Sequence, residues 1–247
     1  MMEEFVRFTN QTQGRERLFR AAQYSCMLLH YLLEQNPGRE EVVMKLKRLE
    51  SNMSSGRKLF RLGNTVHAVV AARQATQLPN LVPRFCLVAS NLNRALYFIC
   101  DTVLWLVSMG FFSDVDQKKW RRRATKCYYY SLVMNLAEDA YELGWRMERA
   151  ARTEAPGKER EDQGQRIQAL SPRVTGGLQP LLSFFYFTLR DHPPLLLDMV
   201  KNICDLSSPL NELGLYKTNA GVLGLCGLIS SIIGILTVTK PHLKLKP

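Results

Sequence analysis

Apolar side chains recur every three or four positions along most of the chain, which is the spacing of one helix face and not the alternation of a strand. Pro, Gly and Asn interrupt this pattern at NPGREE (residues 36–41) and at QLPN (residues 77–80), and such residues end helices. The segments between the breaks predict helices over residues 3–34, 40–53, 57–72 and 131–149. We therefore expect an all-α protein.

The predicted helix over residues 57–72 has two unlike sides. Its apolar stripe comprises Leu59, Leu62, Val66, Val69 and Val70. Its opposite side begins with the cations Arg57, Lys58 and Arg61. Ser54 or Ser55 can cap its start, and Gly63 weakens the helix by about 1 kcal/mol relative to Ala. Such a helix faces a protein core or lies on a membrane, and its own residues leave both interpretations open.

The segment from Thr218 to Thr239 carries no charged residue and is long enough to cross a bilayer. Buried core helices seldom run this long without a charge, so we predict a transmembrane helix over residues 218–239. Small residues four positions apart let two membrane helices approach closely. The pairs here are Gly227 with Ser231 and Ser230 with Gly234, and they predict packing against another transmembrane helix.

The apolar segment at residues 85–112 contains Arg94 and Asp101. A charge at the centre of a bilayer is costly unless it is paired or lies near the interface. Seven positions separate the two residues, so they lie near one face of a helix. Two interpretations stay open: a second span, which we place at residues 84–105, and a helical hairpin in the membrane interface.

These segments give an all-α membrane protein whose regions are defined by their composition. They are a cytosolic amphipathic helical region (1–83), a second transmembrane helix (84–105), a helical region (106–151), a flexible linker rich in charge, Gly and Pro (152–180), a helical region (181–217), the C-terminal transmembrane helix (218–239) and a basic cytosolic tail (240–247).

Basic residues in short flanks favour the cytosolic side of a membrane. Lys240, Lys244 and Lys246 therefore predict a cytosolic C-terminus, and the N-terminal amphipathic helices need the same side. Two cytosolic ends require an even number of spans, which puts the linker inside an organelle. The run from Arg121 to Arg123 opposes this arrangement, because it follows the second span on the lumenal side.

Composition and sequence motifs indicate which ligands and activities to expect of the chain. The formal net charge is +11, and beside a membrane anchor this charge favours anionic membrane lipids over nucleic acid. The six cysteines include no Cys-x-x-Cys pair, the four histidines lack ligand spacing, and no catalytic motif occurs. We therefore expect no enzyme activity, no catalytic residue, no cofactor and no metal site. The opening MMEEFVRFTN lacks the apolar segment of a signal peptide.

Five stretches, in this order, carry a resemblance: FVRFTNQTQGRERLFRAAQY, SSGRKLFRLGN, LNRALYFICDTVLW, HPPLLLDMVKNICDL and PLNELGLYKTNAGVLGLCGLISSI. Together they resemble the peroxisomal membrane protein 11 family of peroxisomal elongation and division factors, and the short charged linker resembles its alpha form. The resemblance implies a peroxisomal membrane protein with both termini in the cytosol that tubulates the membrane and recruits the fission machinery. It also implies a homo-oligomer that engages fission adaptors and related family members. The tail KLKP departs from the K-x-K-x-x form of a coat-binding signal.

Two mechanisms are compatible with these features. In the first, the helix beginning GRKLFRLGN, which the resemblance also identifies as the membrane-inserting element, wedges its Leu and Val stripe into one leaflet while its cations hold anionic headgroups. In the second, oligomerised spans form a pore for small metabolites, with Arg94 and Asp101 facing a wet interior.

Overall fold

The computed structural model describes residues 8–34, 38–112, 115–154, 192–240 and 243. Every regular element within these ranges is a helix, which confirms the all-α class. The helices are α2 (Thr12–Glu34), α3 (Glu40–Phe60), α4 (Asn64–Ala75), α5 (Leu81–Ser108), α6 (Gln117–Glu154), α9 (Pro193–Glu212) and α10 (Ala220–Thr239). The predicted linker at 152–180 and most of the basic tail lie outside the described residues.

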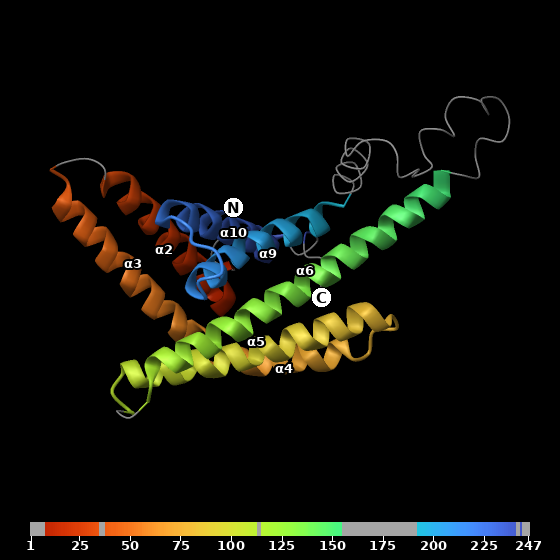
Figure 1. The fold of residues 1–247 in the computed structure, drawn as a ribbon, viewed down its shortest axis with the longest axis horizontal. Coiled ribbons are helices and arrows are strands. Elements are labelled where there is room, and N and C mark those ends of the chain that lie inside the picture. Colours follow the sequence, from red (N-terminus) through yellow and green to blue (C-terminus); the bar gives the residue numbers. More distant parts are fainter. Residues whose placement is uncertain (1–7, 35–37, 113–114, 155–191, 241–242, 244–247) are drawn as a thin grey trace.

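The helices pack as antiparallel neighbours in two groups (Figure 1). In one group α2 packs against α3 and α10, and α9 follows beside α10. In the other group α4 folds back along α5, which lies against the long helix α6. Contacts between α6 and α9 join the two groups, with Leu143 and Leu195 buried against each other.

The buried contacts between helices use small and polar side chains more than large apolar ones. Ser90 on α5 donates from its hydroxyl to the backbone oxygen of Ser131 on α6, at 3.0 Å. Asn202 on α9 donates from Nδ2 to Oδ2 of Asp139 on α6, at 2.8 Å, and both residues are fully buried. A buried polar group is costly unless it is hydrogen-bonded, so these bonds fix which helices pair.

Glycines bring α10 close to α2. A Cβ atom added to Gly227 would lie 2.3 Å from the Tyr24 ring, and one added to Gly224 would lie 3.0 Å from the backbone nitrogen of Leu28. Larger side chains at these positions would push the helices apart. The residues that made α10 resemble a membrane helix therefore also explain its packing inside this chain.

The prediction of one continuous helix over residues 57–72 is wrong. Helix α3 continues to Phe60, a turn follows, and α4 begins at Asn64. Gly63 in this turn has a φ of 88°, a left-handed conformation that costs glycine little and other residues more. Ser54 and Ser55 lie inside α3 and cap nothing.

Within the described residues, α10 is the one helix long and apolar enough to cross a membrane. Of the most apolar stretch of α10, 39 % is buried against the rest of the chain, whereas the core helix of a soluble protein would be mostly buried. Helix α5 is longer, but its sequence is too polar for α5 to count as a membrane-crossing helix by the same measure of length and apolar character. The second span at 84–105 therefore stays a prediction.

Candidate membrane-binding surface and buried ion network

The predicted membrane-inserting residues all lie at the surface. Leu59 ends α3, Leu62 lies in the turn, and the valines follow on α4; exposed fractions run from 38 % at Leu62 to 66 % at Val66. Helix α4 packs on α5 through a stripe of alanines, Ala68, Ala72 and Ala75, which are buried. This close contact turns Val66, Val69 and Val70 outward.

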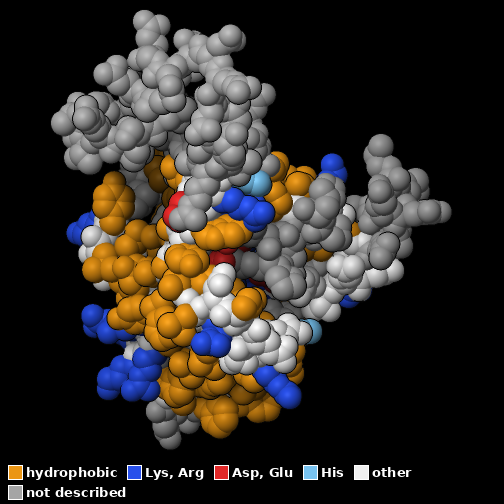
Figure 2. Space-filling model, turned by 90° about the vertical axis from the view of Figure 1, so that its right-hand side faces the viewer, with side chains coloured by type: hydrophobic (Ala, Val, Ile, Leu, Met, Phe, Trp, Pro, Cys, Tyr) orange, Lys and Arg blue, Asp and Glu red, His pale blue; other side chains and the backbone are white. Residues whose placement is uncertain are grey.

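Helix α5 continues the same surface with apolar side chains of its own. The α4–α5 apolar face comprises Leu59, Leu62, Val66, Val69 and Val70 together with Leu81, Val82, Phe85, Leu92, Leu96 and Ile99, all of them exposed. In Figure 2 apolar side chains cover the lower part of the molecule, where Figure 1 places α4 and α5. Exposed apolar patches of this extent mark surfaces that bind lipid or protein. The sequence had indicated each half of the face separately, but not that they adjoin.

Two of the three predicted headgroup-binding cations are engaged inside the protein. Arg57 is buried and donates from Nε to Oε1 of Glu16, at 3.1 Å, and from Nη1 to Oε1 of Gln23, at 2.6 Å. Arg61 donates to the same Glu16 oxygen at 3.2 Å and to Asp101 Oδ2 at 3.3 Å.

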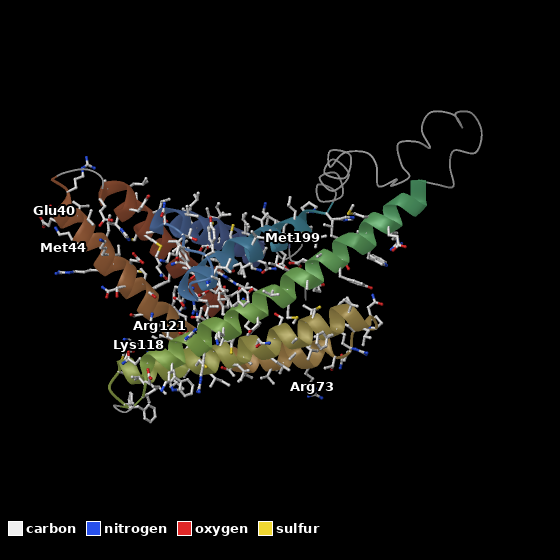
Figure 3. All side chains as sticks on the ribbon, viewed as in Figure 1. Glu40, Met44, Arg73, Lys118, Arg121 and Met199 are labelled. Atoms are coloured by element: carbon white, nitrogen blue, oxygen red, sulfur yellow. The ribbon has the colours of Figure 1, made fainter. Side chains whose placement is uncertain are left out.

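The prediction that these two arginines hold lipid headgroups is therefore wrong for this conformation, because their donors already face carboxylates. Of the three cations, Lys58 is the one without a carboxylate partner among the described residues. Arg73, on the exposed side of α4, projects away from the bundle (Figure 3) and is better placed to reach a membrane surface.

The buried ion network joins α2, α3 and α5 at the end of α3. Burial alone would raise the pKa of the Glu16 carboxyl, but the positive charges of Arg61 and Arg57 outweigh burial and hold this pKa well below its usual range. Burial lowers the pKa of Arg57, and the neighbouring charge of Arg61 lowers it further. Glu16 stays ionised at neutral pH, so the network acts as a structural clamp and not as an acid or base.

The four residues predicted to pack against another transmembrane helix are buried within the chain instead. Gly227 and Gly234 face Tyr24 and Arg17 of α2. Ser230 donates from its hydroxyl to Asp205 Oδ1 on α9, at 2.5 Å, and Ser231 donates to the Gly227 carbonyl oxygen, at 2.6 Å. These four residues are therefore covered by α2 and α9 and are not open to a second copy in this conformation.

Arg94 and Asp101 line one cavity of about 1180 Å³ but form no ion pair with each other. Asp101 is bound by Arg61, which reaches it from the turn after α3. Across the described part of the chain, no group of three or more His, Cys, Asp or Glu side chains is arranged to hold a metal ion.

The family model for peroxisomal biogenesis factor 11 matches residues 2–239. The chain belongs to this family. It is 53 % identical to human peroxisomal membrane protein 11A over 245 residues, which cover 99 % of both chains. It is 44 % identical over the full length of human peroxisomal membrane protein 11B and 27 % identical to human peroxisomal membrane protein 11C, over 90 % of this chain and 88 % of that one. No solved structure matches the chain.

As a member of the peroxisomal biogenesis factor 11 family, the chain is a peroxisomal membrane protein with a role in peroxisome biogenesis. The α4–α5 apolar face suits such a location. Sequence reasoning missed the partners of Arg57 and Arg61, because Glu16 is distant in the chain and nothing near either arginine identifies it. The one local signal for the break in the helix was Gly63.

Proposed function

We propose that this family member elongates peroxisomes and prepares them for division by inserting its α4–α5 apolar face into the cytosolic leaflet of the membrane. The observation that carries the proposal is the exposure of apolar side chains along one side of two packed helices. Copies gathered in one patch would bend the leaflet outward and would present a surface to fission adaptors and related family members.

The α4–α5 apolar face is large enough to hold the protein on a leaflet. Fully burying a Val, Leu, Ile or Phe side chain contributes roughly 1.5–3 kcal/mol, so a half-exposed one contributes about 1 kcal/mol. The face has eleven such residues, which gives on the order of 10 kcal/mol before the entropic cost of association. Each cation at the surface, such as Arg73, adds about 1 kcal/mol on anionic lipid.

Helix α6 supports an interfacial position for α5. It packs along α5 and carries Arg121, Arg122 and Arg123 as well as further charged residues. If α5 crossed the bilayer in this packing, α6 would have to enter it too, at a high cost in charge desolvation. With α4 and α5 lying along the leaflet, α6 stays in water. We therefore propose the interfacial hairpin over the second span at 84–105. Helix α10 stays the membrane-crossing candidate by its sequence, but it packs on the arginine-bearing helix α2, so it can cross a bilayer only after it separates from α2.

Two crossings, with both termini in the cytosol, are the competing topology. The lysines at 240, 244 and 246 support it through the preference of basic flanks for the cytosol. The two topologies differ in where they place residues 155–191, on the cytosolic side for an interfacial α5 and in the lumen for a crossing α5.

The proposed insertion is tested on the full chain reconstituted into liposomes that contain anionic lipid. Val66→Glu combined with Val69→Glu puts two charges on the face, and we expect membrane tubules to disappear from electron micrographs. The matched control is Val42→Glu combined with Met44→Glu, which charges two exposed apolar residues near the start of α3, outside the face. Figure 3 shows the position of Met44. Equal tubulation by both variants, or equal loss, would contradict the proposal.

Depth of insertion gives an independent measurement. A fluorescent amino acid in place of Val69 is expected to be quenched by lipids brominated on their acyl chains, whereas the same fluorophore in place of Met44 is expected to be unaffected. Quenching at Met44 alone would show that the protein lies on the membrane through a different surface.

A pore is a second candidate function, favoured by the cavity that Arg94 and Asp101 both line. The structure gives Asp101 a partner in Arg61, so a pore would have to keep that ion pair in its wall. Conductance in planar bilayers that is lost on Arg94→Gln but kept by the Val66→Glu and Val69→Glu variant would support the pore over the wedge.

A further inference from the structure

The cavity of about 1180 Å³ has an excess of positive charge. Side chains of α2, α3, α5 and α9 contribute to its lining. Among the described residues, the lining contains nine lysines and arginines but six aspartates and glutamates. Apolar residues, among them Leu87, Phe98 and Leu104 of α5, line other parts of the same cavity. A cavity with a cationic region and an apolar region is suited to an anionic ligand or to an anionic amphiphile.

Ion pairs account for part of this charge. Arg57 and Arg61 are bound by Glu16 and Asp101, and Arg20 is bound by Asp205. Lys58, Arg94 and Arg121 have no carboxylate partner among the described residues, and Lys47 is bound by Glu34. Three cations from three helices lie close enough to act on one another: Arg17 on α2, Arg94 on α5 and Lys201 on α9.

The carboxylates near these three cations are few. Lys201 Nζ lies 2.6 Å from Asp198 Oδ1, on its own helix. Arg17 Nε lies 3.9 Å from Glu16, whose other oxygen already binds two arginines. Among the described residues, Arg94 has no carboxylate within ion-pair distance. Asp205 also acts on Arg17 and Lys201, but it is bound by Arg20. Among the described residues, the cluster therefore has more cations than carboxylates.

Two further observations point to an anion. Burial lowers the pKa of the Lys201 ammonium, and Asp198 opposes this effect through its charge and its hydrogen bond. The positive charges of Arg17 and Arg94 make smaller contributions that lower the pKa, so the three cations are close enough to repel one another. Arg20 and Asp205, which line the same cavity and bind each other, are buried, and among the described residues Arg20 Nε and Asp205 Oδ2 each lack a hydrogen-bond partner. An anion among these groups would relieve the repulsion and would offer acceptors to unused donors.

We propose that the cavity holds a phosphate group through Arg17, Arg94 and Lys201. A phosphate group has several acceptor oxygens arranged around one centre, so donors from three different helices can bind it together, and guanidinium groups match its geometry. The phosphate group can belong to the head of an anionic lipid, whose chains would lie on the apolar lining, or to a soluble compound. This site is separate from the α4–α5 apolar face and does not depend on it.

The test uses the full chain purified in a non-ionic detergent and titrated calorimetrically with three probes. Dihexanoyl phosphatidic acid supplies a phosphate group on lipid chains, dihexanoyl phosphatidylcholine supplies the same chains without net charge, and inorganic phosphate supplies the group alone. Binding of phosphatidic acid but not of inorganic phosphate would identify a lipid site. Binding of both with similar affinity would identify a site for soluble phosphates. Failure of both to bind would overturn the proposal.

Variants assign the binding to the cavity. Arg94→Gln is expected to weaken binding about tenfold or more, because one charge-assisted hydrogen bond is lost. The matched control is Arg48→Gln, which removes an exposed arginine of α3 that does not line the cavity and should leave the affinity unchanged. Unchanged affinity in Arg94→Gln, or an equal loss in Arg48→Gln, would refute the assignment.

A structural role for Arg94 is separated from a binding role by the unliganded protein. Arg94→Gln removes a repelling charge, so its melting temperature without phosphate should equal or exceed that of the wild type. If Arg94→Gln melts early instead, Lys201→Gln tests the same cluster. The Val66→Glu and Val69→Glu variant should bind phosphatidic acid normally, which separates this site from the proposed membrane insertion.

Discussion

Glu16→Gln is the most informative single change to the buried ion network. The substitution keeps the size of the side chain and removes the negative charge that Arg57 and Arg61 share at 3.1 and 3.2 Å. The three side chains are 8–16 % exposed, so water screens the interaction poorly. Arg61 would then keep Asp101, whereas Arg57 would have no carboxylate partner among the described residues.

The magnitude follows from the burial of the partners. Removing one member of a buried ion pair typically costs 3–5 kcal/mol, because the other charge is left without compensation. Since Arg61 keeps Asp101 and Arg57 keeps Gln23, we expect the lower end, about 3 kcal/mol. For a chain of this size such a loss lowers the melting temperature by roughly 6–12 °C. The control is Glu41→Gln, which breaks an exposed pair with Lys45 and should cost less than about 0.5 kcal/mol.

Acid provides a second measurement of the same interaction. The pKa of Glu16 is lower in the folded protein than the ordinary glutamate value of 4.5, so its contribution to stability is complete above that value and is lost as the pH falls below it. The difference in melting temperature between wild type and Glu16→Gln should therefore stay constant from pH 7 to about pH 5 and narrow in stronger acid. Circular dichroism in mild detergent measures both curves. A cost no larger than that of Glu41→Gln, or a difference independent of pH, would refute the clamp.

Three further predictions follow from individual positions. Gly63→Ala should cost about 1 kcal/mol because of the positive φ, whereas Gly144→Ala, inside α6 with open space around its Cβ position, should stabilise the protein by about 0.5 kcal/mol; a Gly63→Ala variant as stable as the wild type would argue against the turn. Gly227→Ala should cost about 1–3 kcal/mol, because the added Cβ would clash with the Tyr24 ring. If thermal melts show that Gly227→Ala is as stable as Gly144→Ala, the packing of α2 on α10 is wrong. A protease site at position 164, outside the described residues, should be cut in intact peroxisomes if α5 lies in the interface; protection until detergent is added would establish two crossings.

The all-α class and the exposed Leu and Val stripe could be predicted from the sequence because both depend on local periodicity. A repeat of three to four residues defines a helix face whatever that face contacts. The predicted apolar residues Leu59, Val66 and Val69 therefore lie at the surface, although the predicted helix over residues 57–72 is divided between α3 and α4. The effect of Gly63 on the predicted helix was underestimated. The cost of about 1 kcal/mol applies to a glycine inside a helix, whereas Gly63 lies in the turn between two helices.

Contacts between distant segments could not be predicted in the same way. Arg57 has the same sequence signature whether it binds a phospholipid or Glu16, which lies 41 positions away. Likewise, the small residues of α10 are spaced as in a membrane helix dimer, and α2 of the same chain uses that spacing. In both cases the sequence specified the chemistry of a surface, and the fold determined its partner.

The turn between α3 and α4 connects the buried ion network to the membrane-facing surface. Arg61 is held by Glu16 and Asp101, the next residue is the exposed Leu62, and α4 follows with its valines turned outward. The network therefore fixes the direction in which the apolar residues point before any membrane is met, and insertion needs no coil-to-helix transition. An isolated peptide covering residues 54–76 lacks Glu16 and Asp101, so its Arg57 and Arg61 would be free to bind anionic headgroups. Such a peptide would bind anionic liposomes with a stronger salt dependence than the whole chain, whose Arg57 and Arg61 are engaged by carboxylates. Only the whole chain therefore reports how the α4–α5 apolar face meets a membrane.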